Sequence, residues 1–165
     1  MLDTKRLRIR EARPEDIPYI IDMENHPDNR DFIWQGSLQE HLEEIADENH
    51  ILAILTDRET QERVGYFLAH INFRSEIFEL RRIALAIKGK GYGREVLGAL
   101  FAYAFETKKL NRFWLDVYPH NHIGIRLYES LGMKREGVLR ENYKNSEGRY
   151  LDQIIYSLLA REWKH

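Results

Sequence analysis

The stretch that decides the fold is residues 79–97, ELRRIALAIKGKGYGREVL, in which an apolar run leads through closely spaced glycines into a helical pattern. The run up to Ile87 predicts a strand, and apolar residues recurring at helical spacing after residue 95 predict a helix. Between them, Gly89, Gly91 and Gly93 let the backbone approach an anion, because glycine has no side chain and the N-terminus of a helix is positive. The stretch therefore predicts a strand, a phosphate-binding turn and a helix.

Two other nucleotide-binding loops and a plain turn compete with this interpretation. A Walker loop needs the pattern GxxxxGK followed by Ser or Thr, but Ala84 stands where its first glycine belongs. The dinucleotide fingerprint is disfavoured because Arg94 or Val96 occupies the place of its third small residue, although Asp116 lies at about the right distance. A glycine-rich turn that only joins a strand to a helix stays open from these residues alone.

Hydrophobic periodicity places the other elements on both sides of this stretch. The expected strands cover residues 7–12, 51–56, 64–73, 78–87, 113–117, 133–139 and 150–159, and the expected helices lie near 14–24, 38–47, 94–105 and 121–131. Short polar turns predict antiparallel hairpins, whereas the strand–helix–strand order around residues 78–117 predicts a right-handed parallel crossover. The predicted fold class is α/β (α+β), with a mixed, mostly antiparallel sheet of about seven strands flanked by about four helices.

The composition is typical of one globular domain. The chain has 165 residues, 43% of them hydrophobic and 32% charged, and no linker or repeat divides it, so a single domain over residues 1–165 is expected. No apolar run approaches the roughly 20 residues that span a bilayer, which predicts a cytoplasmic protein with no membrane partner. The net charge of -2 predicts no nucleic-acid partner, and the lack of cysteine excludes thiolate chemistry.

Hydrolase and metal-site motifs are missing from the sequence. The chain contains neither HExxH nor GxSxG. His120 and His122 flank Asn121, but histidines at i and i+2 do not share a helix face, and no third ligand accompanies them. No metal is therefore expected, and His120 remains a minor candidate for a base.

Two motifs together resemble the GNAT family of N-acetyltransferases. Lys88, Gly91 and Gly93 take the places of the family's acetyl-CoA loop, Arg/Gln-x-x-Gly-x-Gly/Ala, with lysine replacing the usual first residue. Residues 115–137, LDVYPHNHIGIRLYESLGMKREG, resemble the second signature, in which a strand is followed by Asn121 and by a helix. The resemblance covers the chain in element order, is strongest from residue 79 to 137, and implies a central parallel pair of strands that splays apart.

The resemblance implies that acetyl-CoA lies where the strand carrying Ile83 separates from the strand at 113–117. The residues expected to contact this cosubstrate are Ile83, Leu85, Lys88, Gly89, Lys90, Gly91, Tyr92, Gly93, Arg94, Asn121 and Arg126. Asn121 would hydrogen-bond the pantetheine arm, the alternative being that its amide only caps the helix. The basic side chains would meet phosphates, the alternative being that they are solvated. The backbone N–H of Leu85 would face the developing oxyanion.

Two residues are expected to move protons. Tyr128 matches the family's general acid, and a tyrosine with a pKa near 10 is protonated at pH 7. Its helical spacing from Leu127 and Leu131 also permits a plain packing role. Glu79 is the leading candidate for the general base, with a simple ion pair to Arg81 or Arg82 as the alternative.

The acceptor is predicted only as a class. Residues 2–16 and 148–163 look most like the branch that includes ribosomal-protein N-terminal acetyltransferases and polyamine or diamine acetyltransferases. The expected function is direct transfer of acetyl from acetyl-CoA to a primary amine, on a polyamine, a diamine, another small amine or a protein N-terminus. The alternative is a noncatalytic acyl-CoA-binding or sensing module. Dimers are frequent in the family, which makes a homodimer consistent with the sequence.

Two segments before residue 50 are candidates for the acceptor side. Phe32, Ile33 and Trp34 lie where family members build part of the acceptor pocket, although surface packing is an equal interpretation. The acidic stretch Glu40, Glu43, Glu44, Asp47 and Glu48 contains no lysine or arginine and could attract a cation. It could equally be the solvated side of a helix whose Leu38, Leu42 and Ile45 face the core.

Overall fold

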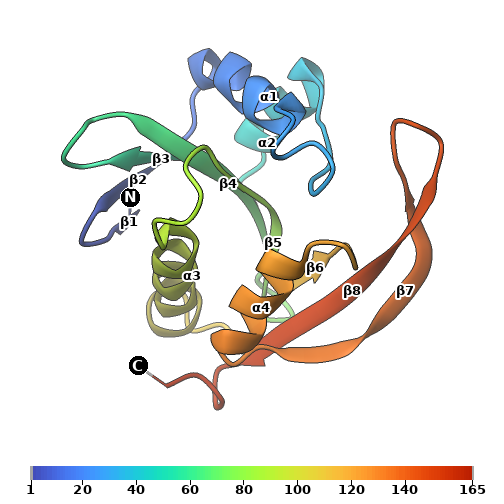
Figure 1. Ribbon diagram of the computed structural model, residues 1–165. Helices are drawn as coiled ribbons and strands as arrows, with labels where there is room; N and C mark the ends of the chain where they lie inside the picture. The colour runs from blue at the N-terminus through green and yellow to red at the C-terminus, as the bar shows by residue number, and fades with distance from the viewer. Residues whose placement is uncertain (1, 165) are drawn as a thin grey trace.

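Eight strands form one mixed sheet in the computed structural model, which describes residues 2–164 (Figure 1). The strands are β1 (Leu2–Asp3), β2 (Leu7–Glu11), β3 (His50–Asp57), β4 (Arg63–Asn72), β5 (Ile77–Leu85), β6 (Arg112–Val117), β7 (Lys134–Lys144) and β8 (Tyr150–Leu159). Their order is β1-β2-β3-β4-β5-β6-β8-β7, and only β5 and β6 pair in parallel within the described chain. The mixed, mostly antiparallel sheet is confirmed, with β1 as an additional short strand.

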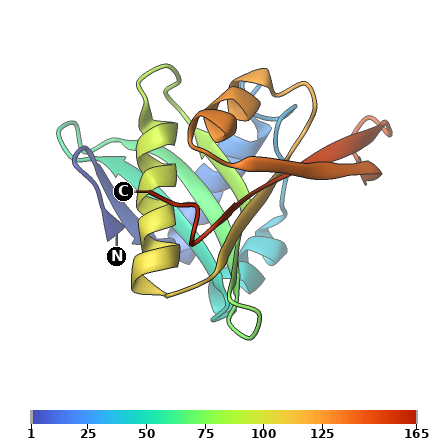
Figure 2. The same cartoon turned by 90° about the horizontal axis from the view of Figure 1, so that it is seen from below.

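Helices cover both faces of the sheet (Figures 1 and 2). A short 3-10 turn, η1 (Pro14–Asp16), leads into α1 (Ile17–Asn25), and α2 (Leu38–Ala46) follows it. On the opposite face lie α3 (Tyr92–Ala102), which continues into a π-helical turn, η2 (Tyr103–Thr107), and α4 (His122–Ser130). The four predicted helices are confirmed. The crossover from β5 through α3 to β6 is the predicted strand–helix–strand unit.

Aromatic packing holds the two parallel strands together at their first residues. The ring of Phe78 on β5 stacks on Phe113 of β6 with centroids 4.8 Å apart, and Phe101 of α3 meets Phe113 edge-on at 4.7 Å. All three side chains are buried. Aromatic pairs in these two geometries add to the free energy gained by burial, so this end of the parallel pair is fixed by the main core.

The same two strands separate further along. The parallel register runs from Ile77 opposite Arg112 only as far as Leu80 opposite Leu115, although β5 continues to Leu85. Arg81 is an extra residue in the ladder with β4, where the register shifts, and such a bulge bends its strand. The predicted splay of the central pair is therefore confirmed, and the bulge gives a local reason for it.

Candidate functional site

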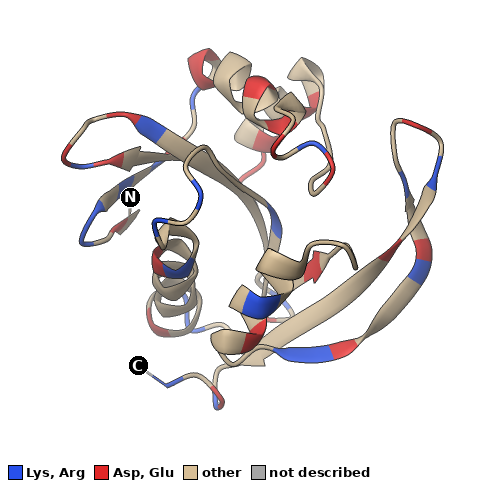
Figure 3. Ribbon diagram, viewed as in Figure 1, with Lys and Arg blue, Asp and Glu red and all other residues tan. Residues whose placement is uncertain are grey.

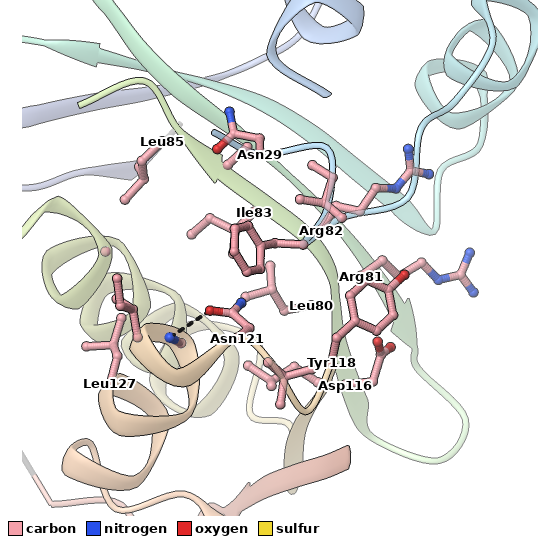
Figure 4. Close-up of a pocket in the computed structure, with 18 of the residues that line it drawn as sticks. Asn29, Leu80, Arg81, Arg82, Ile83, Leu85, Asp116, Tyr118, Asn121 and Leu127 are labelled. Atoms are coloured by element: carbon pink, nitrogen blue, oxygen red, sulfur yellow. Dashed lines mark hydrogen bonds between the residues drawn. The ribbon is translucent and has the colours of Figure 1, made fainter. Parts of the chain in front are cut away.

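A large cavity opens where β5 and β6 separate, and its volume is about 1550 Å³ (Figure 4). It is walled by the second half of β5, the glycine loop, the start of α3, the end of β6, α4 and the segment between α1 and α2. Of the thirteen residues predicted for the site, twelve line it: Glu79, Ile83, Leu85, Lys88, Gly89, Gly91, Tyr92, Gly93, Arg94, Asn121, Arg126 and Tyr128. The thirteenth, Lys90, does not.

The glycine loop has the backbone that its sequence requires. Gly89 and Gly91 have φ angles of +80° and +77°, a region that favours glycine, and Gly91 begins α3 as its N-cap. Apart from Gly89 and its two chain neighbours, no described residue has a heavy atom within 4 Å of the position that a Cβ would take on Gly89. Gly93 is different, because a Cβ there would lie 3.2 Å from Leu127 of α4. The loop thus presents bare backbone at the positive end of a helix, which suits a phosphate.

The basic side chains around the loop differ in their contacts. Lys88 Nζ donates to the carbonyl of Asp28 at 3.1 Å and to Asn29 Oδ1 at 2.9 Å, so this amine ties the loop to the segment after α1. The carbonyl of Lys90 accepts a bond from Arg6. Arg94 donates to Ser130 Oγ at 2.6 Å and lines the cavity. Arg94 is therefore better placed than Lys90 to meet an anion in the cavity.

Asn121 has the capping role that was its alternative interpretation. Its Oδ1 accepts a hydrogen bond from the backbone N–H of Gly124 at 3.0 Å (Figure 4). The cap uses the carbonyl oxygen alone, and the Nδ2 group of the same amide is a donor. Capping and a hydrogen bond to a bound ligand are therefore compatible.

Two carboxylates face the cavity from the separated strands. Glu79 on β5 accepts a bond from Arg81 Nε at 3.1 Å, which is one of its two predicted ion pairs, and its side chain is 19% exposed. Asp116 on β6 accepts a bond from Gln153 Nε2 at 3.1 Å. Burial, and then the negative charge of Glu79, raise the pKa of Asp116 to about 6. Asp116 is not among the site residues predicted from the sequence; its only signal was an acidic residue at the end of a buried strand.

Tyr128 is carried by α4, on another wall of the same cavity. It is 7% exposed and lines the cavity, while its ring packs near Tyr156 with centroids 6.3 Å apart. Burial, followed by the charge of Asp116, raises the pKa of Tyr128 to about 12. The phenol therefore stays protonated through the neutral range, as a hydrogen-bond or proton donor must.

Aromatic rings and acidic side chains also line the cavity. Tyr118 stacks on Tyr143 of β7 with centroids 5.3 Å apart, and Phe32 and Trp34 also line the cavity, Phe32 with its ring centre 5.9 Å from Lys88 Nζ. Four acidic residues from α2 and its C-cap belong to the same lining: Glu40, Glu43, Glu44 and Asp47. The acidic residues of α2, red in Figure 3, therefore border the cavity. The prediction that Leu38 faces the core is wrong, because this side chain is 56% exposed. His41 of the same helix is buried.

A buried charge cluster behind Trp34 also escaped the sequence analysis. His41 donates to Glu24 and Glu44 at 2.7 Å each, and Arg82 contacts the same two carboxylates at 3.0 and 2.5 Å. The Arg82 guanidinium lies 4.6 Å from the centre of the Trp34 ring. The only available signal was a histidine within an acidic, amphipathic helix. The cluster joins α1, α2 and β5, and its Glu44 and Arg82 also line the cavity.

Within residues 2–164, no group of three or more His, Asp or Glu side chains is arranged to hold a metal ion. The imidazole of His120 instead contacts the carbonyl of Asp31 through Nε2 at 2.7 Å. No helix in this part of the chain is both long and apolar enough to cross a membrane.

Comparisons with known proteins match this architecture. The family model described as "Acetyltransferase (GNAT) domain" matches residues 6–134. The uncharacterized N-acetyltransferase p20 of Bacillus licheniformis is 40% identical over 46% of this chain and 42% of its own length. The spermidine N(1)-acetyltransferase of Vibrio cholerae is 34% identical over 52% of this chain and 49% of its own length. The chain thus spans about half the length of these two curated relatives.

Solved structures extend the likeness over nearly the whole chain. A variant of SpeG spermidine N-acetyltransferase from Vibrio cholerae superposes with a TM-score of 0.79, covers 94% of each chain and is 24% identical in sequence. At that identity the match shows the fold alone. The family model, in contrast, matches most of the amino-acid sequence and includes both predicted motifs up to residue 134. The split parallel pair, the glycine loop and these matches agree: the chain belongs to the GNAT acetyltransferase family.

Proposed function

We propose that this chain transfers the acetyl group of acetyl-CoA to a primary amine, with a polyamine or diamine as the leading acceptor and a protein N-terminus as the other. The observation that carries the proposal is the cavity at the separated strands, which has a glycine loop at a helix N-terminus on one side and carboxylates on the other. One side suits phosphates, and the other suits a cation.

The cosubstrate would lie along the open edge of β5. Its ladder to β6 ends at Leu80, so the backbone of Ile83 to Leu85 can pair with the amide-containing pantetheine arm on that side. Asn121 Nδ2 would donate to the same arm, and the loop from Lys88 to Gly93 would hold the diphosphate through backbone N–H groups. Arg94 and Arg126 would add positive charge at this end.

The reaction requires two proton transfers, and the chain has a group for each. A new N–C bond forms as the C–S bond of the thioester breaks, so the amine must lose a proton and the departing sulfur can gain one. Tyr128 would donate that proton to the sulfur. Asp116 and Glu79 would receive the amine's proton, with Asp116 favoured because its raised pKa of about 6 makes it the stronger base near neutrality. The N–H of Leu85 would stabilise the charge on the carbonyl oxygen.

The acceptor class rests on charge. Glu40, Glu43 and Asp47 line the cavity, and their carboxylates attract cations. A molecule with a second positive charge would be drawn to them. The similarity to a spermidine N(1)-acetyltransferase supports the same class.

Turnover with a panel of amines tests this proposal. Released CoA is measured with a thiol reagent, which has a low background because the chain contains no cysteine. Spermidine, spermine, putrescine and a basic peptide with a free N-terminus are compared with uncharged amines such as benzylamine. Turnover of cationic amines that is lost in Tyr128→Phe is expected. An increase of Tm with acetyl-CoA but no turnover of any amine would instead identify a binding module.

A further inference from the structure

The turn between β1 and β2 is joined to the start of α3 by one carboxylate. Glu95 Oε1 accepts hydrogen bonds from Thr4 Oγ1 at 2.5 Å and from the backbone N–H of Arg6 at 2.8 Å. Glu95 Oε2 accepts a third bond, from Arg6 Nε at 2.6 Å. Burial opposes ionisation, but the bonds from Thr4 and Arg6 outweigh it and lower the pKa of Glu95. The carboxylate is therefore charged at neutral pH and holds a turn that is 89 residues away in sequence.

Arg6 reaches from this turn to the glycine loop. Its Nη1 donates to the backbone carbonyl of Lys90 at 2.9 Å, and its guanidinium lies 4.8 Å from the centre of the Tyr92 ring. The hydroxyl of Tyr92 donates to Asp57 at 2.5 Å, which fixes that ring from its far end. Of these residues, Tyr92 lines the cavity, whereas Arg6 and Lys90 do not.

Peptide geometry connects this contact to the cavity. The carbonyl of Lys90 and the N–H of Gly91 belong to one planar peptide, and in a trans peptide these two groups point in opposite directions. No cis peptide is present in the described chain. Holding the carbonyl toward Arg6 therefore turns the Gly91 N–H the other way, and Gly91 lines the cavity. Without that bond, the peptide is freer to rotate, because Gly91 has no Cβ to restrict its backbone angles.

We propose that Arg6 is a positioning residue of the diphosphate site, which acts through the Lys90–Gly91 peptide and does not touch the cosubstrate. This role rests on the proposed function, since it assumes that the loop binds the diphosphate of acetyl-CoA. Because Glu95 balances the charge of Arg6, Arg6 would affect the binding of the diphosphate through the direction of the Gly91 N–H group and not through its own charge. Arg6 also explains why Lys90 lies outside the cavity lining although its neighbours belong to it.

An acetyl donor that lacks the diphosphate distinguishes a role of Arg6 at the diphosphate site from a general loss of activity. The kinetic constants of Arg6→Gln are measured with acetyl-CoA and with S-acetylpantetheine, using an amine that the wild type acetylates. We expect KM for acetyl-CoA to rise roughly tenfold with little change in kcat, since one oriented hydrogen-bond donor is lost. Values for S-acetylpantetheine should stay at wild-type levels. The matched control is Arg58→Gln, because Arg58 supports the same turn through a different hydrogen bond, to the Thr4 carbonyl at 3.0 Å.

The outcomes decide between the two proposals. Equal losses with both donors, or an unchanged KM for acetyl-CoA, would overturn the role of Arg6. If Arg6→Gln does not fold, Arg6→Lys carries the test, because one ammonium cannot form the forked contacts to Glu95 and Lys90 together. Wild-type affinity for acetyl-CoA in folded Arg6→Lys would likewise refute the role. A wild-type chain that fails to bind acetyl-CoA would refute the proposed function and this inference with it.

Discussion

Glu24 and His41 form a hydrogen bond of 2.7 Å between two side chains that are both completely buried. The second ring nitrogen of His41 lies 2.7 Å from Glu44, so both nitrogens face carboxylates and the ring must carry two protons to donate to both. Arg82 supplies the second positive charge, and Tyr66 donates to Glu24 at 2.6 Å. Because two anions and two cations balance, this buried cluster can support the wall beneath Trp34 without an unpaired charge.

The cluster predicts a stability that depends on pH. Burial alone would lower the pKa of His41, but the bonds to Glu24 and Glu44 raise it to about 9. A histidine with a raised pKa contributes its full stabilisation below the unfolded value of about 6.5 and loses it as pH rises through about 9. Tm should therefore fall between pH 6.5 and 9.5, and His41→Gln should remove most of that fall. The control His26→Gln changes a side chain that is 56% exposed, and an identical effect of both variants would contradict the prediction.

Tyr128→Phe should lower turnover roughly 100- to 10,000-fold, the usual range for a lost general acid. The change removes only the hydroxyl of a buried ring, so we expect the packing against Tyr156 and the affinity for acetyl-CoA to change little. Steady-state rates and binding calorimetry measure the two effects. Tyr118→Phe is the matched control, because that phenol also lines the cavity. Wild-type turnover in the folded Tyr128→Phe protein would reject the assigned role.

The sequence predicted those parts of the fold and the site that depend on local backbone requirements. Gly89 and Gly91 must be glycine because their φ angles are positive, and Asn121 follows a strand at the start of a helix, so each carries a local signal. Contacts between distant side chains carry no such signal. Arg82 and Glu24 are 58 positions apart. The spacing of charged residues in the sequence does not predict that Arg82 and Glu24 form a pair. It also does not predict which of several acidic residues Arg82 contacts.

Helix α2 shows why a hydrophobic pattern can misplace a residue. Leu38 and Leu42 are at helical spacing and predict a shared buried face, but Leu38 lies in the first turn and is 56% exposed. His41 occupies the buried position instead, because Glu24, Glu44 and Arg82 satisfy its polar atoms. A histidine becomes a core residue only when such partners are present. The sequence alone does not show that they converge.

Asp116→Asn should stabilise the protein while it slows the reaction. The pKa of Asp116 is raised to about 6, chiefly by burial, so stability declines as pH rises through the window from 3.8 to about 6, and the cost is fully present above it. Asparagine keeps the acceptor for Gln153 and removes the charge. Tm of the variant should exceed that of the wild type at pH 8 and match it near pH 4. Glu79→Gln tests the alternative base: if it costs more activity than Asp116→Asn, then Glu79 receives the proton.

The acidic face of α2 predicts that salt weakens the binding of a cationic acceptor. Glu43 and Asp47 line the cavity, and their attraction for a polyamine should decrease as added salt shortens the screening length to about 3 Å at 1 M. Glu44 must be left unchanged, because it bonds to Arg82 and His41 in the buried cluster. We therefore expect Glu43→Gln combined with Asp47→Asn to raise KM for spermidine several-fold and to reduce its dependence on salt.

A nearby residue and a second acceptor provide the controls for this last prediction. Glu48 is exposed, belongs to the same acidic stretch and does not line the cavity, so Glu48→Gln should leave KM for spermidine close to the wild-type value. An acceptor with an uncharged tail should respond weakly to the Glu43 and Asp47 changes, because only a distant second charge would feel them. Equal changes in kcat/KM for the charged and uncharged acceptors would show that these carboxylates are only the solvated side of the helix.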